Sequence, residues 1–332
     1  MVNKYLLYFT GQCLSLDDHP EFRETIINNF SNGKIKPDDF IKFCSDELIL
    51  PAIYLIFRKH NLMQVFPTDY SKKIIAIYLQ NTNRNHDILK QVEEINSLLI
   101  GKNIITVYLK GVGNLLDNLF SDMGERMIGD IDLLVQDKDY LKTAQILLDS
   151  GYKTYKRVYN DVTTLKHYPR LYKKGHPVDV EIHRLPVNEE YTKDLDTLSV
   201  FQNKKVAAAN SNCFVPSDEH KSLHNFVHAQ LNNHGHLFKI ISLRDFYDFY
   251  LIMKRTNFSD IILQTTEKTK LMTYYYLLSK IFNIQGLPDV INGDKQVSYL
   301  KSIEWYSEHP NMYNYYIFIQ LSKLRLSRLW RY

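Results

Sequence analysis

Two carboxylates separated by one residue, Asp130 and Asp132, have the spacing in this chain that most directly suggests chemistry. They begin the run Asp-Ile-Asp-Leu-Leu-Val, which is typical of a buried strand. Side chains alternate across a strand, so both carboxylates point to the same side. Two like charges held this close repel each other unless a cation lies between them. The pair therefore predicts a Mg²⁺ site that handles phosphates. Relief of the repulsion also predicts that Asp130→Asn or Asp132→Asn leaves the fold intact or slightly more stable.

A second polar group follows the same alternation later in the chain. Asp179, Glu181 and His183 occupy every second position of the segment 177–183, which is typical of a half-buried strand. If the two strands are neighbours, four acids and one histidine meet on one surface of a sheet. Alternation alone also explains Asp179 and Glu181 as the solvent-exposed side of an antiparallel sheet, so both interpretations stay open.

The residues around these carboxylates predict an α/β core between residues 96 and 185. β-branched residues bounded by glycines indicate strands, and apolar residues at helical spacing indicate helices between them. The expected strands are 103–109, 130–135, 152–158, 168–173 and 177–183, and the expected helices are 112–120 and 139–149. The predicted fold class is therefore α+β, with the element order β-α-β-α-β-β-β and a glycine turn at Gly111 after the first strand.

Helical patterns flank this core on both sides. Residues 1–95 and residues 186–332 both repeat apolar residues every three or four positions, as amphipathic helices do. The expected helices cover 70–99 before the core, and 217–231, 237–253, 271–282 and 313–329 after it. No Pro- or Gly-rich linker separates the three regions, so we expect the helices to pack on the core and the C-terminal region to cover the cleft.

The composition argues against several classes of protein. A hydrophobic fraction of 45% and a charged fraction of 23% are ordinary for a soluble globular chain, and a net charge of +4 does not indicate a nucleic-acid partner. No segment approaches the ~18 apolar residues of a membrane span, and the short apolar run at residues 1–9 is expected to be a core segment. Cys13, Cys44 and Cys213 are far apart and indicate no disulfide framework. These features predict a cytoplasmic protein without a membrane partner.

Together, the glycine turn, the Asp-x-Asp strand and the later acidic strand resemble the nucleotidyltransferase superfamily, which has the polymerase-β-like fold. The detail is similar to one bacterial branch, the uncharacterised nucleotidyltransferase family. Lys110-Gly111 resembles its Lys-Gly turn, and residues 126–135 resemble its Arg…Gly-Asp-Ile-Asp-Leu-Leu-Val signature. Residues 181–183 resemble its Asp-Leu-His strand, with glutamate in place of aspartate. The resemblance covers residues 35 to 255.

This resemblance implies a mixed sheet and a two-metal transfer of a nucleotidyl group. Asp130, Asp132 and Glu181 would bind two Mg²⁺ ions, or Mn²⁺, with Asp179 in reserve as the third carboxylate. The residues expected at the nucleotide are Lys110, Gly111, Gly113, Arg126, Gly129 and His183, and those expected to line the cleft are His228, His234, Arg244 and Asp245. The donor would be a nucleoside triphosphate or another activated nucleotide. The acceptor would be a hydroxyl of an unidentified small molecule, sugar, peptide or protein.

One departure concerns the first turn. The wider superfamily has Gly-Ser or Gly-Gly there, with the serine hydroxyl on the nucleotide, whereas this chain has Gly-Val-Gly-Asn at residues 111–114. The branch that the chain resembles also lacks the serine. The departure therefore leaves the match intact but leaves open how the triphosphate is held and whether the donor is a plain nucleoside triphosphate.

Other interpretations compete with this one. Asp-x-Asp also holds the metal of nucleotide-sugar glycosyltransferases, although the α/β core is short for that fold. A non-catalytic nucleotide-binding or interaction protein could keep the fold, but the intact acidic set argues against it. His220, His224 and His228 at helical spacing could bind Zn²⁺, although no HExxH pattern accompanies them. The basic run 325–331 could contact a polyanion, although the pattern favours a solvated helix face.

Overall fold

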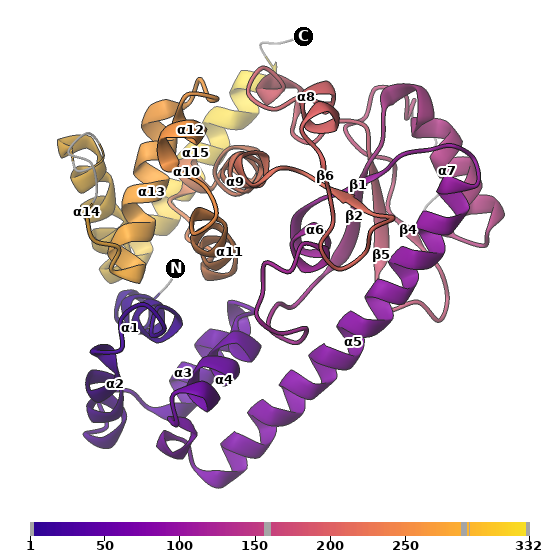
Figure 1. Cartoon of the computed structure of the whole chain (residues 1–332). Helices are drawn as coiled ribbons and strands as arrows, with labels where there is room; N and C mark the ends of the chain where they lie inside the picture. Colours follow the sequence, from indigo (N-terminus) through magenta and orange to yellow (C-terminus); the bar gives the residue numbers. More distant parts are fainter. Residues whose placement is uncertain (1–2, 156–160, 287–290, 292, 330–332) are drawn as a thin grey trace.

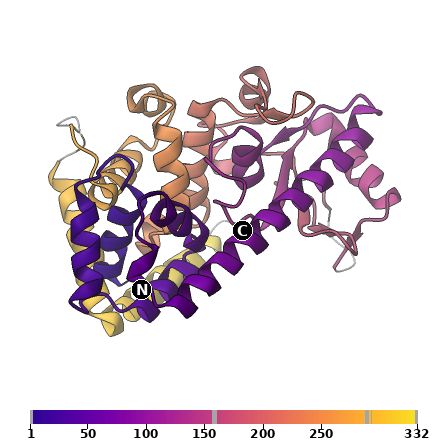
Figure 2. The same cartoon turned by 60° about the horizontal axis from the view of Figure 1, so that its bottom comes forward.

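The structure is a computed structural model that describes residues 3–155, 161–286, 291 and 293–329 (Figure 1). A sheet lies on one side of the molecule and most of the helices lie on the other. The long helix α5 (Thr68–Ile100) runs past both parts (Figures 1 and 2). In the described ranges, no helix combines the length and the apolar character needed to cross a membrane. The predicted α+β fold class is confirmed.

Seven strands of the described residues form one mixed sheet, in the order β3-β4-β5-β2-β1-β7-β6. Their bounds are β1 Val107–Tyr108, β2 Asp130–Leu134, β3 Lys153–Thr154, β4 Leu171–Tyr172, β5 Asp179–His183, β6 Lys205–Val206 and β7 Phe214–Val215. β2 and β5 are parallel, and their register places Asp132 beside Glu181 and Asp130 beside Asp179. β1 runs antiparallel to β2 and parallel to β7.

The alternation of side chains gives both β2 and β5 an apolar side and an acidic side. Ile131 and Leu133 of β2 and Ile182 of β5 are fully buried in a core shared with α5 and α7 (Tyr140–Asp149). The carboxylates occupy the alternate positions of the same strands and therefore point to the other face. Removing the apolar side chains from water stabilises one orientation of the sheet, which fixes the face that presents the acids.

The N-terminal and C-terminal helices share a second hydrophobic core. It contains Phe9 and Phe57 from the beginning of the chain, Phe249 and Leu278 from later helices, and Leu134 from β2. Both views show the N-terminal helices beside the C-terminal ones (Figures 1 and 2). The flanking helices thus pack on the sheet, as predicted. The other helices are α1 Lys4–Leu14, α2 Phe22–Ser31, α3 Pro37–Asp46, α4 Leu50–Lys59, α6 Lys110–Leu116, α8 Thr197–Gln202, α9 Asp218–Phe226, α10 Gly235–Phe238, α11 Leu243–Met253, α12 Phe258–Ile262, α13 Lys268–Phe282, α14 Asp294–Glu308 and α15 Pro310–Leu329.

The sheet differs from the prediction in its extent. Of the expected strand 103–109, only Val107 and Tyr108 form β1, and the Leu109 N–H that follows donates to the carbonyl oxygen of Asp132 at 2.9 Å. β6 and β7 lie beyond residue 185, in the region predicted to be helical. Two-residue strands are too short to show an alternation, so the sequence gives no signal for them. The boundaries at residues 95 and 185 stay a prediction, and residues 156–158 of the expected strand 152–158 lie outside the described residues.

Two of the expected C-terminal helices are interrupted. The segment 217–231 is α-helical only as far as Phe226 and continues as a π-helical turn, Val227–Asn232. The segment 237–253 is divided between α10 and α11, because Lys239 has a φ of 56°, a left-handed conformation that ends α10. Of the basic run 325–331, Trp330 and Arg331 lie outside the described residues.

Candidate active site

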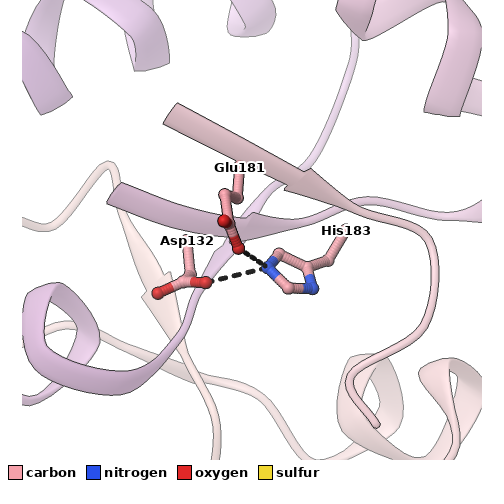
Figure 3. A group of neighbouring side chains, drawn as sticks. All are labelled: Asp132, Glu181 and His183. Atoms are coloured by element: carbon pink, nitrogen blue, oxygen red, sulfur yellow. Dashed lines mark hydrogen bonds and ion pairs between the residues drawn. The ribbon is translucent and has the colours of Figure 1, made fainter. Parts of the chain in front are cut away.

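Asp132, Glu181 and His183 point toward one another from two adjacent strands (Figure 3). His183 Nε2 lies 2.8 Å from Asp132 Oδ1 and 3.4 Å from Glu181 Oε2. One possible ligand atom from each of the three residues lies within 4.8 Å of the others, so the group could hold a metal ion. It is the only such group of histidine, cysteine and acidic side chains among the residues that the structure describes.

The contacts of His183 define what this histidine does in the group. Its Nε2 faces two carboxylate oxygens, which only accept hydrogen bonds, so Nε2 must carry the proton. Its Nδ1 is buried without a hydrogen-bond partner, which a neutral lone pair tolerates better than an N–H would. His183 therefore donates to Asp132 and Glu181 and holds these two side chains in place.

Two cations contact the acids from different elements. Lys110 Nζ lies 2.6 Å from Asp132 Oδ1. Arg170, just before β4, donates from Nη2 to Glu181 Oε1 at 2.6 Å and to Asp130 Oδ2 at 3.1 Å. Its Nε donates to the same Glu181 oxygen at 3.1 Å. The three carboxylates are thus bridged by one lysine, one arginine and one histidine N–H, which offsets most of the repulsion between them.

The three carboxyl groups respond differently to this environment. Burial works to raise the pKa of Asp132, but attraction to Lys110 and the hydrogen bond from His183 hold it well below its usual range. Burial also opposes ionisation of Glu181, but hydrogen bonds from His183 and Arg170 lower its pKa to about 2. Burial and the nearby Asp132 charge raise the pKa of Asp130 above its ordinary value. Asp132 and Glu181 are therefore ionised at neutral pH. The ionised form of Asp130 is the one that is disfavoured by the neighbouring negative charge.

The predicted glycine turn has a different geometry from the expected one. The residue in the left-handed conformation is Lys110, with a φ of 49°, an uncommon state for a side chain with a Cβ. Gly111 would tolerate a Cβ, since the nearest atom would lie 3.5 Å away in Ile128. Gly113 would not, because its Cβ would lie 2.3 Å from the carbonyl oxygen of Tyr108. The glycine that the fold requires here is Gly113, which lets α6 lie against β1.

A pocket of about 430 Å³ lies beside the acids. Of the residues predicted for the site, its walls include Lys110, Gly111, Gly113, Arg126, Gly129, Asp130, Glu181, His228, Arg244 and Asp245. Asp132 and His183 are buried, contact each other and are not part of the lining. Two predicted residues lie elsewhere. Asp179 accepts hydrogen bonds from Tyr155, and His234 packs its ring against Phe238.

Arg126 is paired with a carboxylate that sequence reasoning missed. Its Nε lies 2.8 Å from Asp248 Oδ1 in α11, its Nη2 lies 2.9 Å from Asp248 Oδ2, and both side chains are buried. A further N–H donates to the backbone carbonyl of Met127. The guanidinium thus ties the segment before β2 to α11, and its predicted contact with the nucleotide stays a prediction.

The loop before β4 supplies further pocket residues that the sequence analysis did not name. Lys166, His167 and Arg170 all line the pocket. Burial and the nearby Lys110 charge lower the pKa of Lys166. A signal for Arg170 was present in the sequence: β4 is antiparallel to β5 with Leu171 opposite Val180, so Arg170 falls opposite Glu181. Pairing of the last two predicted strands as a hairpin gives this arginine–glutamate neighbourhood.

His224 of α9 and His228 of the π-helical turn that follows it line the opposite wall of the pocket. His224 Nε2 lies 2.9 Å from the carbonyl oxygen of Pro186. Burial lowers the pKa of His224 well below its usual range, and burial with repulsion from Lys110 lowers that of His228 to about 4, so both rings are neutral at pH 7. Among the described residues, the Zn²⁺ site that His220, His224 and His228 could form is not one of the groups of possible metal ligands. Arg244 and Asp245, both expected to line the cleft, also form an ion pair, with Nε 3.6 Å from Oδ1.

One known protein family matches most of the chain. No curated protein matches the chain. Residues 33–282 match the protein family described as uncharacterised nucleotidyltransferase. The matched segment includes both strands that carry the acids and the helices that form the opposite wall of the pocket. Because the match covers most of its length, the chain belongs to the uncharacterised nucleotidyltransferase family.

Proposed function

We propose that this protein transfers a nucleotidyl group from a nucleoside triphosphate, or another activated nucleotide, to a hydroxyl acceptor in a metal-dependent reaction. The observation that carries the proposal is the position of Asp130, Asp132 and Glu181, which come from neighbouring parallel strands and meet beside a pocket. Membership of a nucleotidyltransferase family supports the general class of reaction.

The donor atoms of the acid group fit a hard divalent cation. Mg²⁺ and Mn²⁺ prefer carboxylate oxygens, and the low pKa values of Asp132 and Glu181 keep these two groups ionised. In our proposal Asp130, Asp132 and Glu181 hold the metal, and the His183 N–H orients two of them. When bound, the metal would neutralise charge on the phosphate oxygens and polarise the group that is transferred.

The residues around the acids would hold the two substrates. Lys110 and Arg170 bring positive charge to two sides of the acid group, where a triphosphate requires it. The other wall of the pocket offers hydrogen-bonding groups from His228 and Asp245, which suits an acceptor with hydroxyl groups. A pKa of about 2 makes the Glu181 carboxylate a weak base, so we assign it to binding the metal and orienting the acceptor.

Direct binding and turnover measurements test this proposal. Thermal shift with Mn²⁺ or Mg²⁺ and each of the four nucleoside triphosphates should raise the melting temperature most when metal and nucleotide are both present. Transfer of label from an α-³²P-labelled nucleotide to a pool of sugars, peptides and cell extract then identifies the acceptor. Nucleotide sugars, tested in parallel, distinguish glycosyl transfer.

Matched variants show whether the acids carry the reaction. Asp132→Asn and Glu181→Gln should abolish label transfer. Asp137→Asn changes an exposed acid outside the pocket, whose side chain is 76% exposed, and should leave transfer unchanged. If no nucleotide raises the melting temperature with either metal, and Glu181→Gln behaves as the wild type does, the protein is not a nucleotidyltransferase.

A further inference from the structure

Arg170 differs from Arg126 and Lys221 in the groups that hold it, and from Lys110, which pairs with Asp132, in that it bridges two of the acids. Arg126 is fixed by Asp248, and Lys221 is fixed by the buried Asp117. Arg170 forms its ion pairs with Glu181 and Asp130, two of the acids that the metal would need. Its side chain thus occupies the position between the two strands that a cation bound by these acids would take.

The exposure of Arg170 allows it to leave this position. Its side chain is 46% exposed, compared with 23% for Lys110 and 9% for Arg126. Arg170 lies just before β4, the strand next to the edge strand β3, and its side chain reaches across β5 to Asp130. A long side chain with one end in solvent can turn away without opening the core.

Electrostatic repulsion prevents Arg170 and a divalent cation from binding Asp130 and Glu181 at the same time. A guanidinium within 3.1 Å of both Asp130 and Glu181 would lie a few ångströms from a divalent cation bound to the same oxygens, and the two would repel strongly. A guanidinium displaced from carboxylates binds a phosphate equally well, because its planar fork matches both groups. The pocket that Arg170 lines is the space available for such a phosphate.

We propose that Arg170 is an exchangeable counter-cation of the acid group: it competes with the metal for Asp130 and Glu181, and when displaced it binds the phosphates of the donor nucleotide. The nucleotide half of this inference rests on the proposed function, whereas the competition with metal does not. The arrangement would prevent tight metal binding until a nucleotide supplies new partners for the arginine, so metal and nucleotide would bind cooperatively.

The test uses two binding measurements whose changes should have opposite signs. Free Mn²⁺ is measured by electron paramagnetic resonance in protein solutions without nucleotide. Because the competing charge is removed, Arg170→Gln should bind Mn²⁺ about tenfold more tightly than the wild type. A fluorescent nucleoside triphosphate is then titrated with Mn²⁺ saturating, and here Arg170→Gln should bind about tenfold more weakly, because a charge-assisted hydrogen bond is lost.

Two further variants keep the test interpretable. Arg170→Lys retains the charge, so its Mn²⁺ affinity should stay near that of the wild type while its nucleotide affinity falls part of the way. Arg184→Gln removes an arginine that pairs with Asp137 at 3.2 Å outside the pocket, and it should change neither affinity. Circular dichroism and thermal melting show that each variant is folded before it is titrated.

The outcomes distinguish this inference from the proposed function. Unchanged or weaker Mn²⁺ binding by Arg170→Gln would overturn the exchange, because Arg170 would then organise the acids for the metal. Unchanged nucleotide affinity would overturn its phosphate-binding role. A wild type that binds Mn²⁺ but no nucleotide would refute the proposed function and the phosphate-binding role, whereas the Mn²⁺ comparison would still decide whether Arg170 competes with the metal.

Discussion

The two carboxylates of β2 should respond differently to the same substitution, because only Asp132 is buried with charged partners. Asp132 is 2% exposed and accepts hydrogen bonds from Lys110 at 2.6 Å and His183 at 2.8 Å. Asparagine there leaves Lys110 without its charged partner. Since hydrogen bonds to charged groups contribute roughly 1.5–3 kcal/mol each, and Lys110 is partly exposed, we expect Asp132→Asn to cost about 3 kcal/mol. The structure thus changes the expectation from sequence, which treated the two positions alike.

Asp130→Asn should instead be neutral or stabilising. Burial and Asp132 raise the pKa of Asp130, so its ionised form is disfavoured in the folded protein. Its ion pair with Arg170 involves a side chain that is 46% exposed, and such pairs contribute at most about 1 kcal/mol. We therefore expect the free energy of unfolding of Asp130→Asn to be within about 0.5 kcal/mol of the wild-type value or higher than it. Urea unfolding in EDTA measures both variants without bound metal.

The free energy of unfolding of the two variants, compared with the wild type, should depend on pH in different directions. The folded pKa of Asp132 lies below the unfolded value of about 3.9, so its stabilisation is present above that pH and is lost as the pH falls through the folded pKa. The difference in the free energy of unfolding between the wild type and Asp132→Asn should be constant near neutral pH and become smaller in acid. The gain from Asp130→Asn should disappear below about pH 3.9, where both states are protonated. Equal stability of Asp132→Asn and wild type at pH 7, with a loss above 1 kcal/mol for Asp130→Asn, would refute this reasoning.

Three further predictions concern residues around the site. Asp248→Asn leaves the Arg126 charge buried without its partner and should lower the free energy of unfolding in urea by about 3–5 kcal/mol. A loss below 1 kcal/mol would contradict this and would mean that Arg126 is available to bind the nucleotide. Gly113→Ala should cost about 1–3 kcal/mol in the same assay, because its Cβ would lie 2.3 Å from a backbone oxygen of β1. Calorimetric titration should show that Asp179→Asn binds Mn²⁺ as the wild type does, whereas Glu181→Gln loses binding; the opposite order would make Asp179 the third carboxylate.

Part of the site follows from local pattern. The period of two in a strand puts Asp130 with Asp132, and Glu181 with His183, whatever the rest of the chain does. The apolar residues between them are enough to define which face is buried. The inferences drawn from the strand pattern held because they depend on neighbours in the sequence. Family resemblance added the expectation that both strands serve one reaction, which stays a prediction.

The remaining features depend on pairings between distant segments. The partner of Arg126 lies 122 residues away in α11, and nothing near either residue identifies the other. The same holds for β7, which joins the sheet beside β1 from beyond the predicted core. The interruption of the helix after Phe226 also depends on what packs around it, because propensity alone favours a continuous helix.

The sequence by itself determined which residues share a face of each strand, because the alternation of side chains is a local property of the backbone. It thereby determined that Asp130 and Asp132 form one unit and that Glu181 and His183 form another. Only the tertiary structure decided that these units are adjacent, that Lys110 and His183 stabilise Asp132, and that Arg170 bridges Glu181 and Asp130. Strand order and register decide such contacts, because the burial of side chains from the whole chain selects them together.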